Sequence, residues 1–151
     1  MSDLDDLYQE LILDHNKRPR NFGRLEAPQA HADGFNPLCG DQVTVDVIFG
    51  SDDRVADVRF SGKGCAISTA SASVMTESVK GRTRSEIDDL FARYHAMVTG
   101  KCDASDSDGL GKLVAFAGVR EFPARVKCAT LSWHTLLAAL AGGGERPIST
   151  E

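Results

Sequence analysis

Apolar residues recur every three or four positions in several stretches of the chain, a spacing typical of amphipathic helices. The first stretch runs from Leu4 to Ile12 and ends at the basic segment 16–20, where a proline stops the helix. The second covers 66–80, the third follows a predicted N-cap at Ser85, and the last covers 129–140. A shorter helix is expected at about 110–117. The pattern therefore predicts that helices dominate.

Strict alternation of apolar and other residues occupies the middle of the chain. It begins at Val43 and ends at Phe49, and the turn 50–54 then leads into a second short stretch, 55–60. This predicts an antiparallel hairpin with one apolar face. The segment 21–37 is expected to be irregular, with a short edge strand. We predict the α+β class, with a small antiparallel sheet, a hairpin or a three-stranded meander, packed against several helices.

Length and charge narrow the class of protein. The 151 residues fit a single domain, 1–151, with about 1–141 folded and 142–151 expected as a flexible tail. With 22 acidic against 17 basic residues the net charge is −5, which argues against nucleic acid as the main partner. No apolar run of about 18 residues and no secretory-type start is visible. We expect a cytoplasmic monomer without membrane contact.

The four cysteines, Cys39, Cys65, Cys102 and Cys128, carry the candidate chemistry. Because the cytoplasm keeps thiols reduced, they are better interpreted as metal ligands or reactive groups than as two disulfides. Two of them, Cys65 and Cys128, lie where helical patterns start in the sequence. There, unpaired backbone N–H groups and the helix dipole would favour the thiolate.

A metal site is predicted around the string Cys39-Gly40-Asp41. Cys39 and Asp41 precede the first strand of the hairpin and Cys65 follows the second, so the hairpin returns these groups to the same end. Three thiolates, Cys39, Cys65 and Cys128, and the carboxylate of Asp41 can complete a tetrahedral zinc shell. The soft sulfur ligands favour zinc, copper(I) or iron–sulfur chemistry over magnesium or calcium. An alternative is an all-cysteine structural site in which Cys102 takes the place of Asp41.

Cys39 is the candidate nucleophile. It lies on a predicted loop beside a glycine, whereas Cys65 and Cys128 are expected to be anchored by helices, so releasing Cys39 would disturb the least structure. A released thiolate would attack a sulfur electrophile such as a persulfide. Arg125 and Lys127 are interpreted either as supports for the thiolates or as solvated cations.

Other residues whose side chains could take part in chemistry are expected to serve in packing or to face solvent. His134 follows Cys128 by six positions and should point away from it on a straight helix, so packing or exposure is the favoured interpretation. Trp133 is assigned to the core. Lys63 is interpreted as a solvated cation and not as a support for a thiolate.

Four motifs together resemble the IscU-like proteins of iron–sulfur cluster assembly, and the resemblance covers nearly the whole chain. The motifs span residues 14–23, 36–41, 62–68 and 126–128. Within that family the chain is more similar to the SufU branch than to the scaffold branch. Lys127 stands where the scaffolds have a histidine before the last cysteine, and the polar segment 100–118 resembles an insertion that the SufU branch carries.

The resemblance implies a zinc-dependent sulfurtransferase that acts with a pyridoxal-phosphate cysteine desulfurase of the SUF type and with downstream SUF assembly proteins. It implies one Zn²⁺ per chain, held by Cys39, Asp41, Cys65 and Cys128. It also implies that a histidine of the desulfurase displaces Cys39, which then receives the persulfide sulfur. Cys102 has no counterpart in the family's ligand set.

Two other functions remain open at this stage. The chain could be a scaffold on which an iron–sulfur cluster is assembled, as in the family's other branch. It could also be a closed structural zinc domain that serves only as an interaction module.

Overall fold

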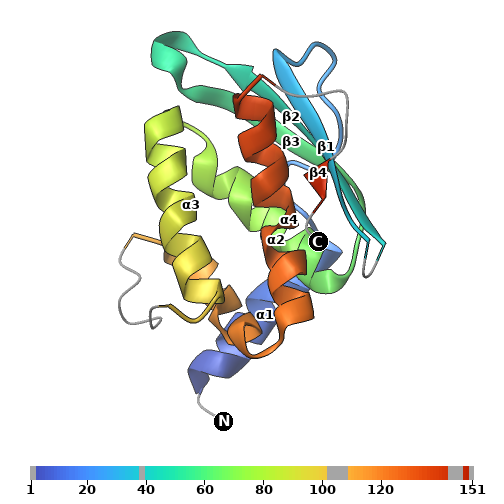
Figure 1. The fold of residues 1–151 in the computed structure, drawn as a ribbon, viewed down its shortest axis with the longest axis vertical. Helices are drawn as coiled ribbons and strands as arrows, with labels where there is room; N and C mark the ends of the chain where they lie inside the picture. Colours follow the sequence, from blue (N-terminus) through green and yellow to red (C-terminus); the bar gives the residue numbers. More distant parts are fainter. Residues whose placement is uncertain (1–2, 38–39, 102–108, 143–147, 150–151) are drawn as a thin grey trace.

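The computed structural model describes residues 3–37, 40–101, 109–142 and 148–149, and for 3–5 and 148–149 the backbone only. The elements, in chain order, are α1 (Asp3–Lys17), β1 (Ala30–Asn36), β2 (Asp41–Phe49), the 3-10 turn η1 (Ser51–Asp53), β3 (Val55–Lys63), α2 (Ala66–Val79), α3 (Arg84–Val98), the 3-10 helix η3 (Gly111–Glu121), α4 (Pro123–Leu140) and β4 (Ile148–Ser149). Figure 1 shows the sheet on one side of the molecule and α2, α3 and α4 on the other.

The sheet has the strand order β3-β2-β1-β4. The two long pairings, β1 with β2 and β2 with β3, are antiparallel, which confirms the predicted α+β class and the predicted hairpin. β4 adds a short parallel strand beside Gly34 and Phe35. Ile148–Ser149, within the stretch 142–151 that is expected to be a flexible tail, pairs with β1 through its backbone.

Alternation along β2 sends Val43, Val45 and Val47 into the space between sheet and helices, where all three are buried. The helices contribute Trp133 and Tyr94 to the core, and these are the two largest fully buried side chains among the described residues. The assignment of Trp133 to the core is therefore confirmed. The sheet and α4 approach closely, and a methyl group on Gly34 would overlap the Thr135 hydroxyl.

The third helix begins earlier than predicted. Thr83, and not Ser85, is the N-cap of α3: the Thr83 hydroxyl accepts from the Glu86 N–H, and the Glu86 carboxylate accepts from the Thr83 N–H. This reciprocal capping box outcompetes Ser85, which lies inside the helix. The short helix expected at about 110–117 is a 3-10 helix that extends to Glu121.

The motif at residues 14–23 joins α1 to α2. The buried His15 ring places Nδ1 2.7 Å from the Ser73 hydroxyl, which also accepts the Arg20 backbone N–H at 2.8 Å. The Asn21 amide donates to the Thr76 hydroxyl at 2.9 Å. These side chains are used to fasten helices together, so this part of the family resemblance is structural.

Among the helices that the structure describes, none combines the length and the apolar character needed to cross a membrane.

Candidate metal centre

The hairpin brings Asp41 and Cys65 together, as predicted. Asp41 is the first residue of β2, Cys65 follows the end of β3, and the register pairs Gln42 with Lys63 next to them. The Cys65 backbone N–H donates to Asp41 Oδ1 at 2.9 Å, and its Sγ lies 3.7 Å from Asp41 Oδ2. Residues separated by 24 positions therefore share one end of the sheet.

Cys65 is the N-cap of α2. Its Sγ accepts the Ser68 backbone N–H at 3.4 Å, which confirms that this thiol lies at a helix N-terminus. One of the N–H groups that have no partner inside the helix therefore points at the sulfur. Cys65 is exposed, so it is the open side of the centre.

Cys128 occupies a different position from the one predicted. α4 begins at Pro123, so Cys128 lies in its second turn and not at its N-terminus. The reason is that proline favours the first helical position, which moves the helix start five residues upstream. Cys128 is buried, and the Asn36 amide, itself buried, donates toward its sulfur at 3.9 Å. An amide, rather than a helix end, faces this thiol.

Three donor atoms converge at this point. One oxygen of Asp41 and the sulfurs of Cys65 and Cys128 all lie within 4.8 Å of one another. Neighbouring ligand atoms around a tetrahedral zinc ion are about 3.3–3.8 Å apart, given Zn–S near 2.3 Å and Zn–O near 2.0 Å. The three groups come from β2, the N-cap of α2 and α4, and they fit zinc in donor type, while an ion would draw the atoms to the shorter spacing.

The burial of Asp41 points to the same conclusion. This carboxylate is only 3% exposed, yet none of the ion pairs among the described residues includes it. Its described side-chain contacts are the backbone N–H and the thiol of Cys65. Because buried charges in proteins are paired or bind metals, a cation between Asp41 and the two thiols would supply the missing countercharge.

Two residues beside the centre were not singled out as site residues from the sequence. Asn36 ends β1 opposite Asp41 and contacts Cys128. Gly64 precedes Cys65, and a methyl group there would lie 3.0 Å from the Ser68 hydroxyl and 3.3 Å from Asp41 Oδ1. The only sequence signal for either is its place next to a predicted ligand motif.

The remaining predicted ligand, Cys39, lies outside the described residues, as does Cys102, so the fourth position stays a prediction. The neighbouring Gly40 has a φ of 77°, a left-handed conformation that favours glycine. A methyl group on Gly40 would meet nothing within 4 Å. The space around Gly40 is therefore open, which agrees with the prediction of a loop beside Cys39.

The nearby cations and His134 are placed as follows. The Arg125 guanidinium lies 4.9 Å over the ring of Phe122, and Lys127 is half-buried. Lys63 is exposed at the end of β3. His134 packs against Phe91, with ring centres 5.2 Å apart, and burial lowers its pKa. The preference for packing over ligation at His134 is thus confirmed.

Known proteins are similar to this chain over most of its length. The family model described as the NifU-like N terminal domain matches residues 7–129. The zinc-dependent sulfurtransferase SufU of Bacillus subtilis is 42% identical over 140 residues, which cover 93% of each chain. The iron-sulfur cluster assembly scaffold protein IscU of Streptococcus pyogenes is 39% identical over 140 residues, 93% of this chain and 86% of that one.

A solved structure has a similar fold. A crystal structure described as an iron-sulfur cluster assembly scaffold protein for the SUF system, from Fervidobacterium islandicum, superposes with a TM-score of 0.81. The two chains are 39% identical, and the match covers 87% of this chain and 94% of that one. With a family model spanning most of the sequence and two relatives matched over nearly their full length, the chain belongs to the NifU-like N-terminal domain family.

Proposed function

We propose that this protein is a zinc-dependent sulfur acceptor and carrier for iron–sulfur cluster assembly. It takes persulfide sulfur from a SUF-type cysteine desulfurase on Cys39. Support comes from the 42% identity to a protein named zinc-dependent sulfurtransferase and from the likeness to a SUF-system structure. The observation that carries the proposal is the group of Asp41, Cys65 and Cys128, in which a buried carboxylate has no described cationic partner.

The residues divide the work between holding the metal and accepting sulfur. Asp41, Cys65 and Cys128 would hold Zn²⁺ together with Cys39, and the ion keeps bound thiols deprotonated at neutral pH. The Ser68 N–H and the Asn36 amide orient the sulfurs of Cys65 and Cys128. Gly40 gives the backbone beside Cys39 the freedom to bring its sulfur to a partner.

The transfer itself is a thiol–disulfide type exchange. The Cys39 thiolate attacks the outer sulfur of a persulfide on the desulfurase cysteine. A new S–S bond forms at Cys39 as the S–S bond of the donor breaks, and the donor cysteine leaves as its thiolate. No external oxidant or reductant is needed, because one persulfide is exchanged for another.

Mass spectrometry after mixing with the desulfurase and L-cysteine tests the proposal. The peptide that contains Cys39 should gain the mass of one sulfur atom, and the rate of sulfide release should rise when the protein is added. Cys39→Ala should lose both effects while Cys102→Ala, a matched thiol deletion outside the ligand group, keeps them. Full stimulation by Cys39→Ala would refute the acceptor role.

A second function, a scaffold for cluster assembly, is favoured by the relatives named as scaffold proteins. It predicts that anaerobic addition of iron and sulfide displaces zinc and gives a stable cluster chromophore. Zinc retained at one ion per chain under these conditions would count against the scaffold.

A further inference from the structure

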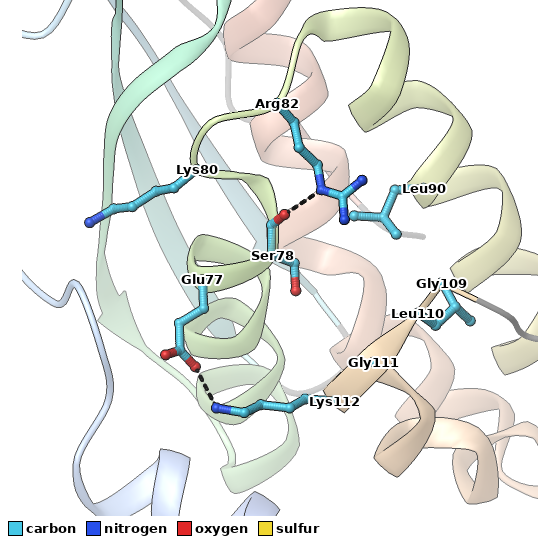
Figure 2. A pocket seen from close by; sticks show the side chains of 9 residues that line it. All are labelled: Glu77, Ser78, Lys80, Arg82, Leu90, Gly109, Leu110, Gly111 and Lys112. Atoms are coloured by element: carbon cyan, nitrogen blue, oxygen red, sulfur yellow. Dashed lines mark hydrogen bonds and ion pairs between the residues drawn. The ribbon is translucent and has the colours of Figure 1, made fainter.

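A second hollow lies at the opposite end of α2 from the metal centre. Its volume is about 450 Å³, and Figure 2 shows it between the last turn of α2, the start of α3 and the start of η3. Cys65 caps the first turn of α2, whereas Glu77 and Ser78 belong to the last turn. At about 1.5 Å of rise per residue the two places are roughly 18 Å apart along the helix.

Arg82 is held in place on one wall of this hollow. Its Nε donates to the Ser78 carbonyl at 2.7 Å, its backbone N–H donates to Val79, and its carbonyl accepts from Val55. Figure 2 shows the guanidinium beside Leu90. In the part of the chain that the structure describes, no further hydrogen bond or ion pair engages its two terminal nitrogens. A preoriented guanidinium fork therefore faces the hollow.

The opposite wall is formed by residues 109–112, at the start of η3. Leu110 is right-handed, with φ −81° and ψ −22°, and Gly111 follows with a φ of 56°. Alternation of this kind turns successive N–H groups toward one point and makes an anion-binding concavity. Gly111 and Lys112 also open η3, so their N–H groups have no acceptor inside that helix. A methyl group on Gly111 would meet nothing within 4 Å, so this wall is open.

The charge balance favours an anion. The lining includes three cations, Lys80, Arg82 and Lys112, and one carboxylate, Glu77, in a chain whose net charge is −5. Lys112 neutralises Glu77 at 3.3 Å. Lys80 points away from Arg82 in Figure 2 and contacts Asn21 and Asp57. Arg82 is thus the lining cation that has no ion pair among the described residues, and Glu86, which lies outside the lining, interacts with its charge electrostatically.

We propose that this hollow binds the phosphoryl group of a small molecule, held by the Arg82 guanidinium and the N–H groups of Gly111 and Lys112. A planar guanidinium matches two phosphate oxygens, and the volume falls in the range of small-molecule sites. Leu90 and Leu110 also line the hollow but are buried in the core, so they leave little apolar surface for the organic part. This site is independent of the metal centre and of the proposed sulfur transfer.

Nuclear magnetic resonance titration of the zinc-loaded protein tests the site, with inorganic phosphate and adenosine monophosphate as separate probes at constant ionic strength. The amides of Gly111 and Lys112 should shift and saturate with a Kd of about 1 mM or tighter. Tighter binding of the nucleotide would identify a phosphorylated small molecule, whereas binding of phosphate alone would reduce the proposal to an inorganic anion site. No saturable shift with either probe overturns it.

Two variants check the assignment. Arg82→Gln should weaken binding at least ten-fold, and Lys112→Gln should weaken it less, because this lysine is shared with Glu77. Arg84→Gln is the matched control, since the Arg84 side chain lies over the ring of Phe49, outside the hollow. Equal weakening by Arg82→Gln and Arg84→Gln would contradict a specific site. Zinc content should be unchanged in all three variants.

Discussion

β2 carries two buried aspartates, and they differ in what surrounds them. Asp46 is fully buried and accepts 2.7 Å and 3.3 Å hydrogen bonds from the Arg24 guanidinium and a third from the Leu25 N–H. This contact raises the pKa of the Arg24 side chain. Asp41, five residues earlier, is 3% exposed, faces two thiols and has no described cationic partner.

The difference separates a structural carboxylate from a ligand. Asp46 has its countercharge within the chain, so it stabilises the fold whether or not an ion is present. Asp41 has none among the described residues, so in the metal-free protein it is a buried carboxylate that a cation would stabilise. Substitution of Asp41 should therefore lower the zinc affinity, whereas substitution of Asp46 should lower the free energy of unfolding.

The largest effect is expected at Asp41. Asp41→Ala should weaken zinc binding about a thousand-fold, or roughly 4 kcal/mol, because the only hard ligand of the group is lost. Competition with a chromophoric chelator measures this affinity. In urea denaturation the metal-free variant should be as stable as the metal-free parent or more so, since an uncompensated carboxylate has gone. A large loss of stability without zinc would show that Asp41 is a fold residue like Asp46.

Asp46→Ala should show the reverse pattern. Removing one partner of a buried ion pair costs about 3 kcal/mol, and the partial exposure of Arg24 keeps the loss from being greater. The measurement is the free energy of unfolding in urea. Zinc affinity should stay within about two-fold of the parent value, and a ten-fold decrease would mean that the two ends of β2 are coupled.

A smaller effect is expected from crowding Asp41 instead of removing it. Gly64→Ala places a methyl group against Ser68 and Asp41, so the ligands must shift by a few tenths of an ångström. We expect zinc affinity to fall about ten-fold, in the range found for outer-shell changes at metal sites. The matched control is Gly118→Ala, where a methyl group meets nothing within 4 Å. Equal affinities in the two variants would contradict the crowding argument.

The smallest effect concerns pH. Burial lowers the pKa of His15, Arg20 and Lys112 lower it further, and Glu77 and Asp14 oppose the shift. A histidine whose folded pKa is depressed leaves stability intact above its unfolded pKa of about 6.5, and stability is lost as pH falls below that value. His15→Gln should therefore flatten the dependence of unfolding free energy on pH between about 7 and 5. His134, shifted in the same direction, should keep some slope.

An unchanged slope in His15→Gln would mean that His15 titrates normally in the folded protein. Neither outcome should alter zinc affinity, because His15 contacts α2 at Ser73, away from the ligands. Measuring unfolding free energy and zinc affinity on the same samples distinguishes an effect at His15 from an effect at the metal centre.

Most of the fold follows from patterns that are local in the sequence. Alternation at Val43, Val45 and Val47 identified the hairpin, and the hairpin alone places Asp41 beside Cys65. Helix starts were less predictable. The choice of Thr83 over Ser85 depends on Glu86, and the start of α4 depends on Pro123 rather than on the cysteine that drew attention.

Contacts between distant elements could not be predicted. Nothing near Asn36 in the sequence indicates a thiol 92 residues away, and nothing near Asp46 indicates Arg24 as its partner. The motif around His15 is one of the four that carry the family resemblance, and the sequence does not indicate that its side chains fasten α1 to α2. Packing between elements decides such roles, and it is visible only in three dimensions.

X-ray absorption at the zinc edge of the purified protein tests the central claim most directly. The account predicts one zinc per chain with three sulfur neighbours at about 2.3 Å and one oxygen at about 2.0 Å, and the loss of one sulfur neighbour in Cys128→Ala. Zinc surrounded only by nitrogen and oxygen, or an unchanged spectrum in Cys128→Ala, would contradict it.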